Sequence, residues 1–430
     1  MPKAHSQPLA ALFAINKPTG VPSMTLLNNL QPLFSSSKIF RDPNKADGQQ
    51  GNNKKFGKYG RRGKGRGRDD KVKMGQGGTL DPLADGVLVV GTNAATKSLS
   101  RFLDCTKEYR AIGLFGCTTD SYDSDGKWVR KAAWDSITRE RVESVLDQFR
   151  GEIEQTPPVY SALKMDGKPL YEYARSGTPL PRPIPTRKVT VHALKLLRFE
   201  TGDRHENELP RLELEEDKRK ELERLEKMVR EGRTTVPTEE EVATTAPSAD
   251  GSADPEADGT NRSAPTETAS SSSSSTNPPA LAPASNDRPP IFEIQLTVSS
   301  GTYIRSIVHD IGLALGSAAH VVKLTRTRQG EFVLDPPRAT TVLDGEVGGA
   351  PETAAAAAAE EAPKPQQQQQ PNKLELETFS GGCIEWSLLE KAIAAHAEAK
   401  KEGRDEVTEG RDEDGWLEWE RELLSKCKEV

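Results

Sequence analysis

The fold is decided by the stretch Gly77-Gly78-Thr79-Leu80-Asp81-Pro82-Leu83-Ala84-Asp85-Gly86-Val87-Leu88. A glycine pair leads into an Asp-Pro step, and the apolar, β-branched run after it predicts a strand. Pro82 disfavours the α conformation at Asp81, so this carboxylate lies on an extended and rigid piece of chain. The glycines would let another backbone or a ribose-phosphate approach closely. Taken alone, the step favours a plainer interpretation, in which Asp81 only caps a turn, because Asp-Pro turns are common.

Apolar runs with strand or helix spacing predict the elements around this loop. The Ile304 to Leu315 run has helical spacing. Strands are further predicted at 12–15, 86–90, 108–115, 189–199 and 291–298, and helices at 136–149, 211–233 and 383–427.

Composition indicates one core divided by insertions. Only 34% of the 430 residues are hydrophobic, and 29% are charged. Such a chain has segments that cannot bury enough apolar surface to become ordered, so we expect a single core of roughly 200–250 residues. The expected division is catalytic core at 1–28, 74–203 and 290–345, a basic insertion at 29–73, a charged helix and disordered low-complexity insertion at 204–289, a low-complexity linker at 346–375 and a helical C-terminal tail at 376–430.

Charge is distributed unevenly along the chain. The formal net charge is −6, but the segment from Lys54 to Lys73 contains ten Lys/Arg and two Asp, a local charge of +8. A basic block of this kind predicts a salt-dependent grip on RNA or a nuclear localisation signal. The alternative is a loop that only keeps the protein in solution.

Four widely spaced cysteines form no Cys-x-x-Cys pair, and there is no His-Glu-x-x-His motif. A disulfide framework or a zinc site is therefore not expected, and a reducing compartment fits the sequence better. No apolar run approaches the ~20 residues that span a bilayer, and the N-terminus lacks the apolar core of a secretory signal. We expect an intracellular protein without membrane contact, in the nucleus, with mitochondrion and cytoplasm left open.

The loop at 77–88 resembles the signature of the TruB family, the tRNA pseudouridine-55 synthases. Other segments of the chain resemble further motifs of the same family, in the same order. These segments are 16–20 (Asn-Lys-Pro-Thr-Gly), 107–110 (Lys-Glu-Tyr-Arg), 116–126 (a Gly-x-x-Thr-Asp-x-x-Asp-x-x-Gly pattern), 156–175 (opening Thr-Pro-Pro-Val-Tyr-Ser-Ala-Leu-Lys) and 301–306 (Gly-Thr-Tyr-Ile-Arg-Ser). Together they extend over about half of the chain, and the long insertions suggest a eukaryotic, fungal-like member. The resemblance reverses the plainer interpretation of Asp81.

The resemblance implies a role for several residues. Asp81 would be the catalytic aspartate, and Tyr109 would stack on the target base and later act in proton transfer. Arg305 would pair with Asp81 and hold it ionised and oriented. The segment Tyr303 to Arg305 would form a strand at the active cleft, where Tyr303 and Leu324 would line the uracil pocket. Judged singly, Tyr109 is more simply explained as a core aromatic, and Arg305 as a solvated or backbone-binding cation; the ordered motifs favour the functional roles.

Supporting roles are implied for a second group. Lys17 would support the active-site framework, although a surface lysine before a turn stays an alternative. Tyr160, Lys164 and Tyr173 would face the RNA or be structural. Many family members place a histidine at the position of Gln76, where it wedges into the RNA loop; glutamine can hydrogen-bond a base edge but stacks poorly.

The expected fold is α+β, the pseudouridine-synthase fold, with a mixed, mainly antiparallel sheet and flanking helices. The expected reaction moves uracil from a C1′–N1 to a C1′–C5 bond, without redox change or external group, so no metal and no cofactor is expected. The expected partner is the T-arm of tRNA, with messenger RNA left open, and the protein is expected to act as a monomer. The alternatives are a guide-RNA-dependent enzyme of the dyskerin type and an RNA-binding or tRNA-folding module whose catalysis is secondary.

Overall fold

The computed structural model describes four stretches of the chain, which are 8–41, 71–222 apart from 177, 179 and 221, 288–334, and 382–430 apart from 405, 406 and 408. Most of the basic block, the Ser/Pro-rich part of the second insertion and the linker at 346–375 lie outside these residues. The predictions for those segments therefore stay predictions.

The chain divides into two compact units. Unit 1 consists of Met1–Cys105 together with Arg326–Val430, and unit 2 is Thr106–Thr325. Strand β12 (Ala319–Gln329) carries the chain from unit 2 into unit 1. Both ends of the chain thus belong to the unit that holds the Asp81 loop.

Unit 1 is built on two antiparallel strands, β1 (Ala11–Lys17) and β3 (Asp85–Thr92). They pair so that Lys17 lies opposite Gly86. All of β1 except Asn16 is buried, which explains its almost continuous apolar sequence, since a strand covered on both faces has no polar side. The other elements of the unit are α1 (Ser23–Ser36), β2 (Met74–Gln76), the 3-10 helix η1 (Asn93–Leu99), α2 (Ser100–Asp104), β13 (Phe332–Val333), β14 (Ile384–Glu385), α8 (Trp386–Lys401), α9 (Glu418–Lys426) and β15 (Lys428–Glu429).

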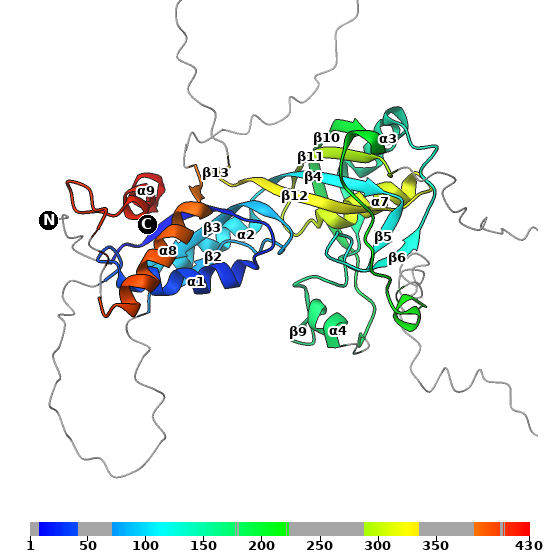
Figure 1. Ribbon diagram of the computed structural model, residues 1–430. Coiled ribbons are helices and arrows are strands. Elements are labelled where there is room, and N and C mark those ends of the chain that lie inside the picture. The colour runs from blue at the N-terminus through cyan, green and yellow to red at the C-terminus, as the bar shows by residue number, and fades with distance from the viewer. Residues whose placement is uncertain are drawn as a thin grey trace, which may run out of the picture. The chain divides into compact units, whose positions relative to one another are not determined.

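The C-terminal residues complete unit 1. Strand β14 pairs in parallel with β1, and β15 pairs with the same strand in antiparallel. Helices α1 and α8 pack against each other (Figure 1). Trp419 of α9 stacks on Phe34 of α1, with ring centroids 5.4 Å apart, and Phe34 stacks in turn on Phe40 at 4.7 Å. Stacked aromatic rings at such distances contribute beyond the apolar area they bury.

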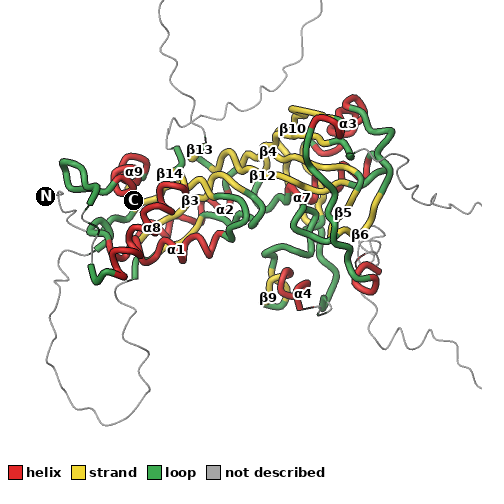
Figure 2. The backbone as a smooth tube through the Cα atoms, in the orientation of Figure 1, coloured by secondary structure: helices red, strands yellow, loops and turns green. Residues whose placement is uncertain are grey.

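Unit 2 is built on an antiparallel sheet with the strand order β4-β11-β10-β7. Figure 2 shows β4 and β10 of this sheet as yellow strands. Its strands are β4 (Lys107–Phe115), β7 (Gly151–Gln155), β10 (Arg187–Glu200) and β11 (Ile291–Val298). Helix α7 (Ile304–Ala314) packs closely on β4, since a Cβ at Gly113 would lie 2.9 Å from a Val308 methyl carbon. The prediction of a mainly antiparallel sheet with helices is confirmed.

The predicted helix at 136–149 is shorter in the structure. Helix α3 (Arg139–Val145) begins late because Thr138 is its N-cap, with the hydroxyl accepting from the main-chain N of Arg141 at 3.3 Å. The 3-10 helix η2 (Leu146–Phe149) then ends the segment. A hydroxyl that satisfies the first free N–H groups marks the start of a helix more sharply than apolar spacing does.

The predicted strand at Tyr303 to Arg305 is wrong. Tyr303 is the N-cap of α7, and Arg305 lies in the first turn of that helix. Buried apolar residues follow at helical spacing in the same segment, at Ile304, Ile307 and Val308. This spacing extends back to Ile304, so the helix takes in Arg305.

Two small hairpins complete unit 2. Strands β5 (Cys117–Thr119) and β6 (Trp128–Lys131) pair with each other, as do β8 (Lys164–Met165) and β9 (Lys168–Pro169). Helix α4 (Leu170–Ser176) follows the second hairpin and forms a small apolar cluster with it. The segment 156–176 therefore has a core of its own.

Candidate active site

The Asp81 loop connects β2 to β3 within unit 1. The main-chain carbonyl of Asp81 accepts a hydrogen bond of 3.1 Å from the main-chain N of Ala84. This bond closes a turn around the Asp-Pro step. The side chain of Asp81 is half-buried. Where the loop enters β3, Gly86 has a φ of 98°, a conformation that favours glycine.

The segment after β1 holds the loop on one side, through the residues next to Asp81. Ser23 donates from its hydroxyl to the Leu80 carbonyl at 2.8 Å and accepts from the Leu80 main-chain N at 3.1 Å. The main-chain N of Gly20 donates to the Pro82 carbonyl at 2.7 Å. The two neighbours of Asp81 in the chain are thus fixed by their own peptide groups.

Lys17 is a buried cation at the base of the same loop. Its ammonium donates to three carbonyl oxygens, those of Pro18 at 2.8 Å, Val21 at 2.7 Å and Pro82 at 3.2 Å. Its side chain is fully buried, and this desolvation lowers its pKa from 10.5 to about 8. Two carboxylates, Asp85 and Asp81, oppose that shift.

The surface interpretation of Lys17 is therefore wrong, and its contacts agree with a role in the framework. An ammonium that satisfies three carbonyls ties the Asn-Lys-Pro-Thr-Gly turn to the Asp81 loop.

Gln76 lies on β2, just before the loop. Its Nε2 donates to the hydroxyl of Thr79 at 3.2 Å, and its Oε1 is buried with no hydrogen-bond partner among the described residues. The amide therefore contacts the loop itself. Its predicted contact with RNA stays a prediction.

Arg305 is the centre of the corresponding arrangement in unit 2. Only 4% of this residue is exposed. One guanidinium nitrogen, Nη1, donates to the Ser121 carbonyl at 2.7 Å and to Asp123 Oδ2 at 3.0 Å, and Nη2 donates to the Tyr160 carbonyl at 2.9 Å. The hydroxyl of Ser121 donates to the other oxygen of Asp123 at 2.6 Å. The result is a buried, hydrogen-bonded ion pair.

Tyr303 and Tyr109 also belong to unit 2. Gln155 holds the backbone of Tyr303 in both directions, accepting from its N at 2.7 Å and donating to its carbonyl at 2.9 Å. The guanidinium of Arg187 lies 5.5 Å from the centroid of the Tyr303 ring. Tyr109 is buried on β4 opposite Leu296.

The RNA-side candidates differ from each other. Tyr160 hydrogen-bonds to Asp120, and burial is the main cause that raises the pKa of both groups. Lys164 is exposed on β8. Tyr173 is buried, with its hydroxyl donating to the Met165 carbonyl at 3.1 Å.

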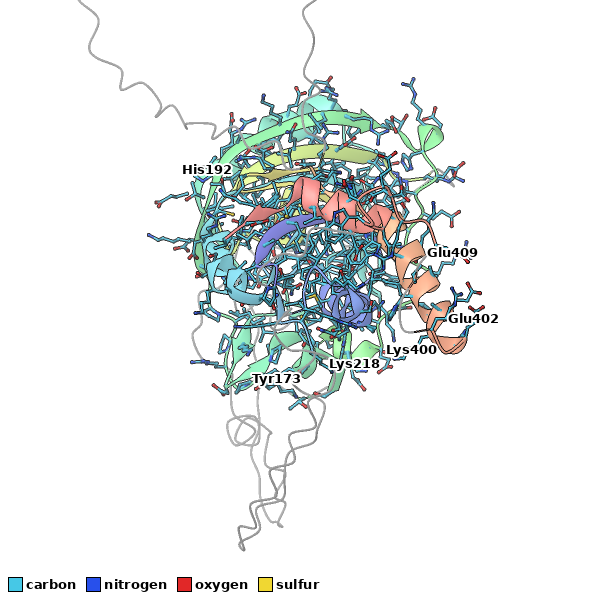
Figure 3. The ribbon with its side chains drawn as sticks, turned by 90° about the vertical axis from the view of Figure 1, so that its left-hand side faces the viewer. Tyr173, His192, Lys218, Lys400, Glu402 and Glu409 are labelled. Carbon is cyan, nitrogen blue, oxygen red and sulfur yellow. The ribbon has the colours of Figure 1, made fainter. Side chains whose placement is uncertain are left out.

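A cavity of about 100 Å³ lies beside Tyr160 and Tyr173. Its other wall comes from the beginning of the second insertion, through Leu214, Lys218 and Leu222. Figure 3 shows Tyr173 and Lys218 on the same side of the molecule. The described start of this insertion, a helical turn at 216–220, therefore belongs to the folded part of unit 2.

The structure thus joins predicted residues within each unit. In unit 1, Lys17 contacts the Asp81 loop; in unit 2, Arg305 contacts the backbone of Tyr160. Leu324 is buried on β12. The predicted pairing of Asp81 with Arg305 stays a prediction.

Sequence reasoning missed three residues that hold these groups. They are Asp123, which pairs with Arg305, and Arg326 and Gln329, which are buried at the end of β12 and contact the Asp81 loop. Asp123 was visible as the second aspartate of the Thr-Asp-x-x-Asp motif, but no local feature named its partner. An arginine in an alternating strand looks like a solvent-facing residue, so Arg326 gave no signal.

Among the described residues, no cluster of His, Cys, Asp and Glu could hold a metal ion. Within the same residues, no helix has the length and apolar character needed to cross a bilayer.

Comparison with known proteins identifies the family. Residues 66–215 match the model of the TruB family pseudouridylate synthase N-terminal domain, and residues 305–344 match that of the tRNA pseudouridylate synthase B C-terminal domain. The chain is 40% identical over 339 residues to "tRNA pseudouridine synthase 4" of Schizosaccharomyces pombe, a match that covers 75% of this chain and 79% of that protein. The chain belongs to the TruB family.

Two further matches extend this result. The Saccharomyces cerevisiae "tRNA pseudouridine synthase 4" is 35% identical, covering 75% of this chain and 78% of that protein. The "tRNA pseudouridine synthase B" of Azoarcus is 51% identical over 128 residues, which is 30% of this chain and 42% of that protein. The expectation of a fungal-like TruB member is confirmed.

Solved structures were also matched. A Cbf5-Nop10-Gar1 complex gives a TM-score of 0.35 at 20% identity, covering 76% of this chain and 50% of that chain. An H/ACA RNP bound to a substrate RNA gives 0.38 at 16% identity, covering 97% and 59%.

Membership of the TruB family gives the geometry a chemical meaning. The loop presents a half-buried carboxylate on a backbone fixed at both neighbours. Preorganisation of this kind lowers the cost of placing a nucleophile or base at the reacting atom.

Proposed function

We propose that this TruB family protein is a stand-alone tRNA pseudouridine synthase that isomerises uridine 55 in the T-loop, with Asp81 as its catalytic carboxylate. The observation that carries the proposal is the match to two fungal proteins named tRNA pseudouridine synthase 4, each covered over more than three quarters of its length. The rigid Asp81 loop supports the assignment of the carboxylate.

The proposed reaction breaks the C1′–N1 bond of uridine, rotates the detached uracil and forms a C1′–C5 bond. N1 gains a proton and C5 loses one, so no electrons enter or leave. Asp81 acts either as nucleophile at C1′ or as base at the ribose, and both routes require the same carboxylate. The uridine must leave its stack before the loop can reach it.

The other residues keep the base and the carboxylate in place. Tyr109 stacks on the uracil, an interaction worth roughly 1–3 kcal/mol per base, and later takes part in proton transfer. Arg305 pairs with Asp81 during the reaction, while Asp123 and two carbonyls hold the guanidinium. Tyr303 and Leu324 line the uracil pocket. These roles follow the family motifs.

The basic segment 54–73 supports two further parts of the proposal. Its +8 charge would bind the phosphates of the T-arm, and of suitable messenger RNA hairpins, in a salt-dependent way. It would also direct the monomeric protein to the nucleus. Replacing its Lys and Arg by Gln is expected to reduce the salt slope of RNA binding and to remove a fluorescent fusion from the nucleus. An unchanged slope and location would contradict both roles.

The experiment that tests the function is tritium release from tRNA transcribed with C5-tritiated uridine. Forming the C1′–C5 bond expels the C5 hydrogen, so release reports the isomerisation directly. The purified protein alone should release about one equivalent per tRNA, and none from a matched transcript with cytidine at position 55. Release only after a guide RNA is added would favour the dyskerin-type alternative. Tight binding without release would favour a binding or folding module.

A further inference from the structure

The Asp81 loop is held on a second side by the end of β12. Arg326 lies on this strand with only 1% of its surface exposed, among the largest fully buried side chains of the described residues. A guanidinium removed from water to this degree is costly unless its N–H groups are bonded and its charge is compensated. The position of its hydrogen bonds therefore shows what this arginine contributes.

Arg326 bonds to the chain on both sides of Asp81. Its Nε donates to the Val87 carbonyl at 2.7 Å, in β3 just after the loop, and its Nη2 donates to the Gly78 carbonyl at 3.3 Å, at the start of the loop. One rigid, planar group thus connects the two ends of the loop. An ammonium on a flexible stem lacks this fork and would not hold both carbonyls in the same way.

The backbone of β12 touches the loop as well. A Cβ at Gly86 would lie only 2.3 Å from the carbonyl oxygen of Arg326, so this position admits only glycine without movement of the strand. Three residues further along, the buried amide of Gln329 donates to the Gly77 carbonyl at 2.7 Å and to the Phe102 carbonyl at 3.0 Å. Gly77, where the loop begins, is therefore anchored to the same strand.

The charge of Arg326 belongs to a local group of four. Its field contributes to the lowered pKa of Lys17, while Asp85 and Asp81 act in the opposite direction. Two cations and two carboxylates thus act on one another's surroundings at this loop through the position of Lys17. A residue that only filled space in the core would not need to be charged.

We propose that Arg326, assisted by Gln329, is a positioning residue for catalysis, because it fixes the distance between the two ends of the Asp81 loop and with it the place of the carboxylate. The inference rests on the proposed function of that loop. Neither residue touches the substrate in this account. Their loss acts through Asp81, so it lowers the rate of the chemical step and leaves RNA binding unchanged.

The test uses the full-length protein and three variants. Arg326→Lys keeps the charge but removes the fork, and Gln329→Met removes the Gly77 contact without adding charge. Lys323→Met is the matched control, because Lys323 is an exposed cation on the same strand. Each protein is measured for single-turnover tritium release, for its Kd for tRNA and for hydrogen exchange of the amides in 78–87.

Arg326→Lys should lower the single-turnover rate by ten- to a hundredfold, since a displacement of about 1 Å at a reacting group can cost 10²-fold. Gln329→Met should lower the rate by about tenfold. Both should keep the Kd for tRNA within twofold, and in both the amides of 78–87 should exchange faster than in the wild type, while those of the β4–β11 pair keep their wild-type rates. The control should match the wild type in all three measurements.

Wild-type rates and unchanged exchange in both variants would overturn the proposal, and so would a loss of activity that appears entirely in the Kd. If Arg326→Lys fails to fold, Gln329→Met decides by the same criteria. Hydrogen exchange requires no activity, so it separates the two claims. Faster loop exchange in the variants of a protein that releases no tritium would support the clamp and contradict the proposed function.

Discussion

Asp81 and Arg305 are held in place by opposite means. The loop of Asp81 is fixed through its main chain, since Ser23, Gly20 and Lys17 all bond to peptide groups of its neighbours. Arg305 is fixed through its own side chain, which donates to two carbonyls and to Asp123. The catalytic candidate in unit 1 is therefore presented by its backbone, whereas the one in unit 2 is part of the core.

Because of this difference, substitutions at the two residues should affect catalysis and stability to different degrees. A side chain presented by its backbone can be changed without disturbing the bonds that position it. A buried ion pair cannot lose one member without leaving the other charged and unpaired. Substitutions at Asp81 leave the cited bonds that hold the loop in place and should report mainly chemistry, while those at Arg305 report chemistry and folding together.

The largest effect on stability is expected for Arg305→Met. Asp123 would remain buried without its partner, which costs about 3–5 kcal/mol of unfolding free energy. Urea unfolding followed by circular dichroism measures this loss. The double variant Arg305→Met with Asp123→Asn should recover part of it. A single variant as stable as the wild type would show that the pair does not hold unit 2 together.

The second effect is a pH dependence of the single-turnover rate, which arises from Lys17 at the base of the Asp81 loop. Lys17 has a folded pKa of about 8, and its neutral amine has two N–H donors for three carbonyls. The single-turnover rate should fall by up to about tenfold per pH unit above pH 8. Because the folded pKa lies below the usual 10.5, this group favours folding more as the pH rises from 8 to 10.5, so the fall is not unfolding.

The matched measurement for this pH dependence is a thermal melt at pH 8 and at pH 9.5. The account expects activity to fall while the lysine's contribution to stability increases. A flat rate up to pH 9.5 would show that the loop does not depend on the charge of Lys17.

The smallest of the three effects is expected for Ser23→Ala. This change removes both hydrogen bonds to Leu80 and leaves a buried peptide group with fewer partners, which costs about 1–3 kcal/mol. The amides near Leu80 should lose protection against hydrogen exchange before amides elsewhere do. Ser36→Ala is a control, since that hydroxyl only bonds to Leu33 within α1. Equal effects of the two variants would contradict a specific role for Ser23.

The sequence could predict the parts that depend on local pattern. The loop of Asp81 follows from its glycines and its Asp-Pro step, and strand β4 with Tyr109 follows from alternation. The helical position of Arg305 was missed because a motif was given more weight than the apolar spacing that continues through Ile304. Its partner Asp123 lies 182 positions away, and no local pattern connects two such residues.

The contribution of β12 was beyond sequence reasoning for a similar reason. Arg326 is a charged residue in an alternating strand, where burial is decided by what the strand packs against. The backbone of Arg326 lies so close to Gly86 that a Cβ at position 86 would be 2.3 Å from the Arg326 carbonyl oxygen. Such information exists only once the two segments are placed side by side.

The most direct test of the central claim is Asp81→Asn, measured for both tritium release and stability. We expect no release from C5-tritiated tRNA under conditions in which the wild type releases about one equivalent. We also expect an unchanged Kd for tRNA and an unfolding free energy within about 0.5 kcal/mol of the wild type, because asparagine keeps the size of the side chain and the loop stays bonded through its main chain. Release that survives in Asp81→Asn, or a loss of release that comes with unfolding, would contradict a catalytic carboxylate presented by a loop whose main chain is bonded to its surroundings.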